Sequence, residues 1–100
     1  MPTLILNGRL DLRCDPSANA YAHLELAAGQ EVWLSVKGRK VDSALTLMDD
    51  LGQRFGTWEH GGVDGGVLGA FRAKRACTLT LSVHSRSGAG TCTLRALAVE

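Results

Sequence analysis

The chain has 100 residues, of which 45% are hydrophobic and 21% charged, and its net charge is +1. These values are typical of one folded domain, here residues 1–100, that needs neither a metal nor a disulfide to build its core. The weak charge argues against a nucleic-acid partner, and no apolar run approaches the roughly 20 residues of a membrane-spanning helix.

The first half of the chain predicts a series of strands, because apolar and polar residues alternate between short turn-forming runs. The predicted strands are Leu4–Leu12, Tyr21–Leu26, Glu31–Lys37 and Val41–Met48. In the third, Val32, Leu34 and Val36 form the inner row, which places Trp33 on the opposite face. The fourth strand ends in a turn at Asp49, Asp50 and Gly52.

The second half continues the same pattern. The predicted strands are Gln53–Trp58, Val67–Arg72, Cys77–His84 and Thr91–Val99. A glycine-rich loop separates the first two, and we expect the last two to form a hairpin across Ser85–Gly90. No segment shows a sustained helical period, so the sequence predicts an all-β protein, an antiparallel sandwich or barrel of about eight short strands.

Three cysteines leave at least one thiol unpaired, and no pair has zinc-ligand spacing. In the expected hairpin Cys92 lies opposite Val83 and Cys77 opposite Ala98, too far apart for a disulfide. We therefore interpret both cysteines as small core residues. The histidines, His23, His60 and His84, also lack the spacing of a metal site.

Calcium is the one metal for which the sequence offers candidate ligands. These are Asp49, Asp50 and Asp64, with Glu59 as a further carboxylate. The alternative is that the aspartates cap backbone N–H groups in turns, and this is the favoured interpretation. Asp42 cannot share a calcium site with Asp49, because an extended strand would separate the two by roughly 23 Å.

No catalytic arrangement is found, since Ser82 and His84 share a strand face but lack a third group to orient the imidazole. The candidate binding residues are instead aromatic. Trp33 is expected on an outer sheet face, and Trp58 adjoins the loop that contains Glu59 and His60. Exposed tryptophans are typical of sugar-binding and protein-binding surfaces; the alternative for Trp33 is cover by a neighbouring segment.

Several segments together resemble the bacterial pre-peptidase C-terminal domain, a jelly-roll-like β-sandwich found after secreted proteases and in other exported proteins. The matching segments are Gly8–Leu10, Tyr21–Gln30, the Asp-x-x-Leu-x-Leu-x-Asp-x-x-Gly pattern of Asp42–Gly52, and Cys77–Val83 with Gly90–Leu94. The chain departs from the family in carrying cysteines where its closing strands have aromatics. It also has Trp58–Gly62 where an acidic stretch is expected, which weakens the calcium interpretation.

The resemblance implies an exported, non-catalytic module that binds a protein or polymer partner. A carbohydrate-binding module and a self-assembling structural protein, a homo-oligomer, are the alternatives. Met1–Gly8 lacks the basic region and apolar length of a signal peptide. We therefore expect either a cytoplasmic protein or a mature or excised piece of a larger one.

Overall fold

The computed structural model describes residues 1–59 and 66–99, which form six strands and no helix. The strands are β1 (Arg9–Cys14), β2 (Ala20–Leu26), β3 (Glu31–Met48), β4 (Arg54–Glu59), β5 (Gly66–Arg72) and β6 (Cys77–Val99). All pairings between them are antiparallel. The all-β prediction is confirmed, with six strands instead of about eight. Within the described residues, accordingly, no helical segment suited to crossing a membrane is found.

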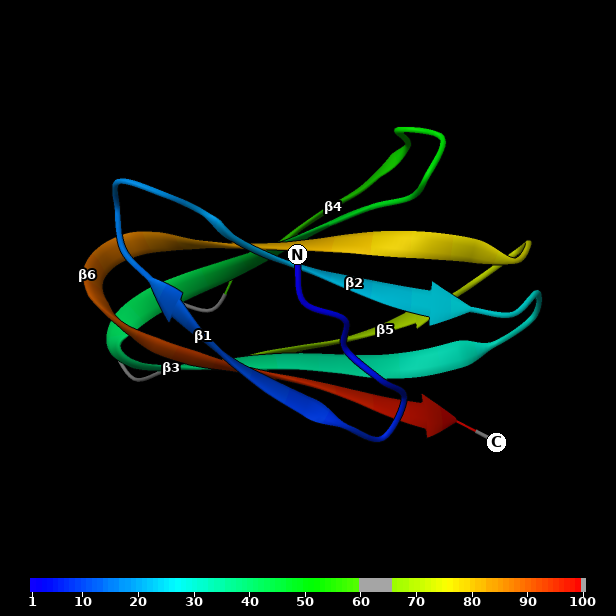
Figure 1. The fold of residues 1–100 in the computed structure, drawn as a ribbon, viewed down its shortest axis with the longest axis horizontal. Coiled ribbons are helices and arrows are strands. Elements are labelled where there is room, and N and C mark those ends of the chain that lie inside the picture. Colours follow the sequence, from blue (N-terminus) through cyan, green and yellow to red (C-terminus); the bar gives the residue numbers. More distant parts are fainter. Residues whose placement is uncertain (60–65, 100) are drawn as a thin grey trace.

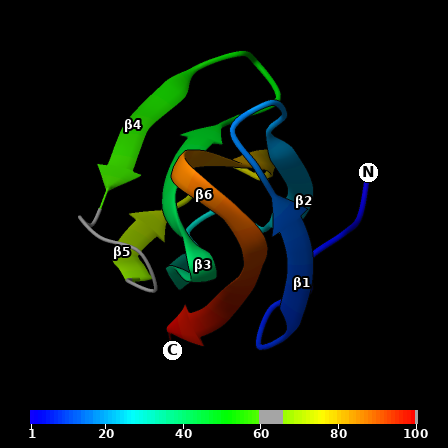
Figure 2. The same cartoon turned by 90° about the vertical axis from the view of Figure 1, so that its left-hand side faces the viewer.

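The strands lie in two layers, because β3 and β6 are long, paired with each other, and bent (Figure 1). The first layer contains β1, the second half of β6, the first half of β3, and β5. The second layer contains β2, the first half of β6, the second half of β3, and β4. Figure 2 shows how β3 and β6 curve between the layers, which makes the fold a jelly-roll-like sandwich.

The predicted hairpin across Ser85–Gly90 is wrong, because these residues continue β6 as one strand. Cys92 therefore lies opposite Leu12 of β1 and Gly38 of β3, and not opposite Val83. The bend brings two backbones together: a Cβ atom on Gly90 would collide with the carbonyl oxygen of Arg39. Glycine at this position permits the close approach of two strands instead of forming a turn.

The core lies between the layers and is built from the inward-facing residues of each strand. The predicted inner row of Val32, Leu34 and Val36 is confirmed, since all three side chains are 1% exposed or less. Leucines at alternating positions of the other strands are buried to the same degree, among them Leu24, Leu45, Leu81 and Leu94. The inward-facing residues of both halves of β3 thus point into one core, although the two halves belong to different layers. This fixes which side chains of the first layer face outward.

Candidate functional site

Trp33 lies on the outer face of the first layer, with its side chain 43% exposed. Its direct neighbours across the sheet are Ala70 of β5 and Leu97 of β6. Val32 and Leu34, which flank it in the chain, are buried in the core. The backbone at Trp33 is therefore fixed by hydrogen bonds to β5 and β6 and by the burial of Val32 and Leu34 in the core. The indole projects from a central strand of the layer.

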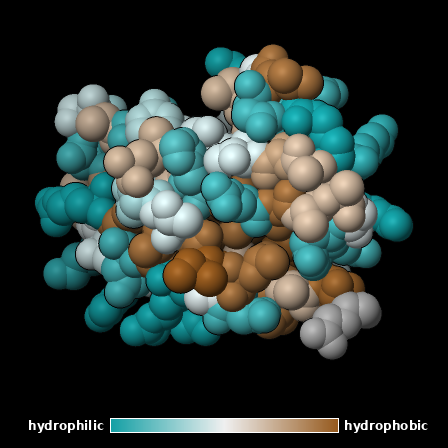
Figure 3. All heavy atoms as spheres, turned by 45° about the vertical axis from the view of Figure 1, so that its right-hand side comes forward, coloured by the Kyte–Doolittle hydropathy of each residue, from teal (hydrophilic) through white to brown (hydrophobic). Residues whose placement is uncertain are grey.

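Two leucines extend the apolar surface beside the tryptophan. Leu68 of β5 is 68% exposed and Leu97 is 58% exposed, and we call the three residues Trp33, Leu68 and Leu97 the Trp33 patch. Figure 3 shows apolar residues lying among polar ones on the side of the molecule turned toward the reader. Exposed apolar groups clustered on one face, unlike single ones, are typical of interaction surfaces.

The patch lies in a shallow hollow of about 350 Å³, which a second hollow of about 650 Å³ continues along the sheet. The residues that line both hollows are Arg9, Ser35, Leu68 and Arg95. The two hollows therefore form one open groove, called here the Trp33 groove. Trp33 lines one end of it, and Lys37 and Arg39 line the other.

Trp58 differs from the expected second exposed aromatic, because it is half-buried and packs against the core. It lies opposite the inward-facing Leu45, so its side chain faces into the sandwich. Near it, the rings of Phe55 and Phe71 meet edge-on with centroids 4.8 Å apart. Trp58 and Phe55 thus come from β4 and close the core beside β5.

Asp49 and Asp50 are held by nitrogen donors. The Oδ1 atom of Asp49 accepts hydrogen bonds from the backbone N–H groups of Leu51 and Gln53, at 3.0 and 2.8 Å. The Arg75 guanidinium lies 3.3 Å from Asp49 Oδ2 and 2.6 Å from Asp50 Oδ1, and it holds the pKa of Asp50 below its usual range. This geometry favours the interpretation of both aspartates as turn-stabilising residues.

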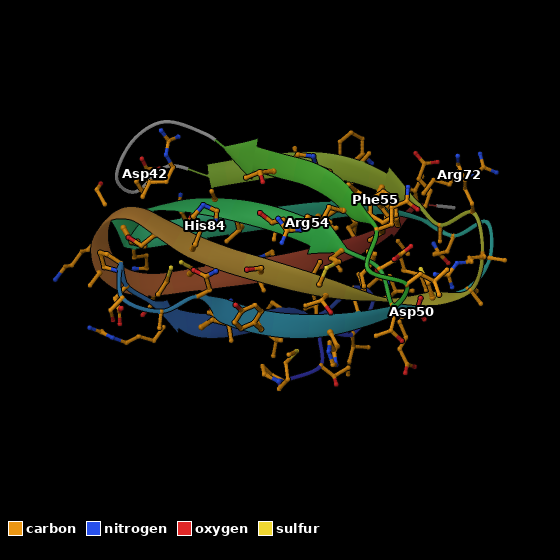
Figure 4. The ribbon with its side chains drawn as sticks, turned by 90° about the horizontal axis from the view of Figure 1, so that it is seen from above. Asp42, Asp50, Arg54, Phe55, Arg72 and His84 are labelled. Atoms are coloured by element: carbon orange, nitrogen blue, oxygen red, sulfur yellow. The ribbon has the colours of Figure 1, made fainter. Side chains whose placement is uncertain are left out.

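Among the described residues, Asp42 lies far from these two aspartates (Figure 4). Figure 4 shows Asp42 and Asp50 at opposite ends of the molecule. Asp42 is buried, and its Oδ1 atom has no hydrogen-bond partner among the described residues. Glu59 ends β4 opposite Ala44. His60 and Asp64 lie outside the described residues, and the calcium site stays a prediction.

The second layer carries a separate hollow of about 660 Å³ that the sequence did not reveal. Short hydroxyl side chains dominate its lining, among them Thr46, Thr57 and Ser82, with Tyr21 and Arg54 beside them. The hydroxyls of Thr46 and Thr57 lie 3.0 Å apart and bond each other. Figure 4 shows Arg54 and His84, two further lining residues, on this side of the molecule.

All three thiols are free. Cys14 and Cys92 are buried as neighbours on β1 and β6, whereas Cys77 is half-buried. Burial, with Cys14 close by, raises the pKa of Cys92 to about 12. The Ser43 hydroxyl next to Cys92 acts in the opposite direction, but its Oγ atom is not in hydrogen-bonding geometry with any described group. The thiols are thus protonated core groups at neutral pH.

No protein-family model and no curated protein sequence matches this chain. Its fold is similar to that of the pre-peptidase C-terminal domain of a collagenase from Bacillus anthracis. That comparison has a TM-score of 0.76 and 16% sequence identity, covering 95% of this chain and 92% of the collagenase domain. The resemblance found in the sequence is thus confirmed at the level of the fold.

The fold is also similar to that of PliG, a periplasmic inhibitor of g-type lysozyme. For PliG from Salmonella Typhimurium the TM-score is 0.63 and the identity 10%, covering 99% of both chains. For PliG from Aeromonas hydrophila the values are 0.53 and 11%, covering 95% of this chain and 96% of that one. At such identities the likeness establishes a shared fold and not a shared function.

Proposed function

We propose that the chain is a non-catalytic accessory or interaction module that binds a protein or polymer partner through the Trp33 patch. The observation that carries this proposal is the exposure of Trp33, Leu68 and Leu97 together on one paired sheet face. A rigid aromatic ring buries a large area at a low cost in side-chain entropy, which makes it an effective contact residue.

A binding role without catalysis is supported by the shared fold and by the surroundings of the two residues that had suggested a catalytic pair. The amide of Asn19 donates a hydrogen bond of 3.4 Å to the hydroxyl of Ser82. The hydroxyl accepts this bond, and no hydrogen bond between Ser82 and His84 is found among the described residues, so the pair lacks the contact by which a general base would activate a nucleophile.

We also propose that the protein acts outside the cytoplasm. Two solved structures with this fold belong to periplasmic lysozyme inhibitors. The sequence likewise resembles a domain of exported proteins. Expression with and without an added export signal, followed by fractionation and measurement of the folded protein, tests whether the chain tolerates the oxidising environment outside the cytoplasm.

The binding face is tested by comparing Trp33→Ala with Tyr21→Ala. Tyr21 is a matched control because it is also 43% exposed but lies on the second layer. We expect Trp33→Ala to reduce retention on a panel of immobilised polysaccharides and exported proteins, while Tyr21→Ala retains wild-type binding. Equal behaviour of the two variants would contradict the proposal.

Self-association through the same patch is distinguished by light scattering. A mass that rises from monomer to dimer with concentration, and that Trp33→Ala returns to monomer, would identify a second copy of the chain as the partner. A protein that stays monomeric at all concentrations would exclude a second copy of the chain and support a different molecule as the partner.

A further inference from the structure

We propose that the Trp33 groove binds an acidic polysaccharide, with its arginines on the carboxylates and Trp33 on a sugar ring. This inference rests on the proposed function, which assigns the binding face, and adds the chemistry of the partner. The described charged residues that line the groove are all of one sign.

Four exposed cationic residues line the groove: Arg9, Lys37, Arg39 and Arg95. None of these four forms an ion pair with another described residue. The nearest acidic position on this face is Asp11, one step along β1 from the pair Arg9 and Arg95, and its carboxylate accepts a 2.7 Å hydrogen bond from Thr93. Among the described residues, the charged side chains that line the groove are therefore all cationic, despite the small net charge of the chain.

The arrangement of two of these residues is unfavourable for the isolated protein. Arg9 of β1 and Arg95 of β6 are direct partners across the sheet. Like charges at directly opposed positions on neighbouring strands repel each other and destabilise the pair. An anionic ligand between the two guanidinium groups would attract both and offset their mutual repulsion. The direct pairing of Arg9 with Arg95 is therefore the observation that most favours a negatively charged partner.

The spacing of Trp33 and Arg95 fits a sugar unit that carries an acid group. Ser35 lies opposite Arg95 in the register of β3 and β6, and Trp33 is two residues before Ser35 on the same face. Two residues along a strand span roughly 7 Å, so the indole and the guanidinium lie in adjacent rows. A sugar ring resting on the indole would therefore bring its carboxylate to Arg95, where a guanidinium can form two parallel hydrogen bonds.

The sheet itself favours a polysaccharide over an acidic peptide. An extended peptide gains most of its affinity by adding a strand to an open sheet edge. The groove crosses β6 and β3, and both strands are hydrogen-bonded on both sides in the first layer. A partner on this face can therefore contact only the side chains of the protein and not its backbone. A polysaccharide suits such a surface, because its sugar rings and acid groups are all accessible to those side chains.

The test measures binding to polygalacturonate, to its methyl-esterified form, and to poly-L-glutamate. We expect binding to polygalacturonate that weakens as salt rises, at least tenfold weaker binding to the uncharged ester, and weak binding to poly-L-glutamate. We expect Arg9→Gln and Arg95→Gln each to weaken binding to polygalacturonate by about tenfold, a change of about 1.4 kcal/mol. The control is Arg54→Gln, which removes an exposed arginine of the second layer and should leave binding unchanged.

The melting temperatures of the variants separate binding from folding. Because Arg9 and Arg95 repel each other, removing either charge should not lower the melting temperature. Equal binding of the acid and ester polymers, or equal effects of Arg95→Gln and Arg54→Gln, would overturn the inference. Tighter binding of poly-L-glutamate would overturn it in favour of an acidic peptide. If Trp33→Ala still weakened binding of the ester in those cases, the proposed function would stand without this inference.

Discussion

The ring of Trp58 covers the α-carbon of Gly69: a Cβ atom added there would lie 2.6 Å from a ring carbon. The two residues come from β4 and β5, which belong to different layers. Their contact therefore helps to close the sandwich along the side where those strands lie. The half-buried position of Trp58 follows from this role in packing.

Gly69→Ala is expected to destabilise the fold, because the ring of Trp58 has to shift to admit a methyl group. Overpacking of this kind costs about 1–3 kcal/mol. Urea unfolding measures the change. The control is Gly66→Ala on the same strand, where a Cβ atom would come no closer than 3.4 Å to its neighbours and the effect should be smaller. A Gly69→Ala protein as stable as the Gly66→Ala protein would contradict the packing seen here.

The contact of Arg75 with Asp50 predicts a pH-dependent contribution to stability. The hydrogen bond from Arg75 lowers the pKa of Asp50 in the folded state below its unfolded value of about 3.9. The contribution is therefore fully present above the unfolded pKa and is lost as pH falls through the folded pKa. We expect Arg75→Gln to be less stable than wild type at pH 7, with the difference shrinking below about pH 4. A difference that stays constant from pH 7 to pH 2 would show that the ion pair contributes nothing.

Calcium is expected to leave the melting temperature unchanged. Asp49 Oδ1 already accepts two backbone hydrogen bonds, and the Arg75 guanidinium occupies the position between Asp49 and Asp50 that a cation would need. A ligand that binds only the native state must raise stability. Melting curves in excess calcium and in excess chelator should therefore coincide. A higher melting temperature in calcium, absent in Asp49→Asn, would establish the predicted metal site instead.

Thiol labelling should distinguish Cys77 from the other two cysteines. Cys14 and Cys92 are fully buried, and the raised pKa of each lowers the fraction of reactive thiolate at neutral pH. Cys77 is partly exposed, although burial raises its pKa too, so its reaction should be slow and should accelerate as pH rises. Peptide mapping after treatment of the native protein at pH 8 should find the label on Cys77 only. Labelling of Cys92 at the same rate would contradict the buried position described here.

Local alternation was sufficient to predict the class of the fold and the face of the sheet on which Trp33 lies. Val32, Leu34 and Val36 form an inner row by their period alone, and that row leaves Trp33 outside whatever the neighbouring strands are. The inner position of Cys92, Leu94 and Ala96 follows in the same way. These features depend on a single strand, and a single strand is what a sequence pattern describes.

The bends and the groove depend on pairings between distant segments. Gly88 and Gly90 indicated a turn, because glycine is common in turns and its use in a close strand approach leaves no separate signal. Arg9 and Arg95 are separated by 86 positions in the sequence, and only the register of β1 with β6 places them opposite each other. Leu68 and Leu97 join Trp33 for the same reason. The sequence thus showed one residue of the groove and not its neighbours.

The course of β3 and β6 also determines how the protein can come apart. Each strand contributes to both layers, and the two are paired along nearly their whole length, from Glu31 with Val99 to Met48 with Thr80. Neither layer can therefore open while the other stays intact, and unfolding should occur in one cooperative step. Folding must first join segments that are far apart in the chain, which makes it slow for a protein of this size. Cutting the chain within either strand would damage both layers at once.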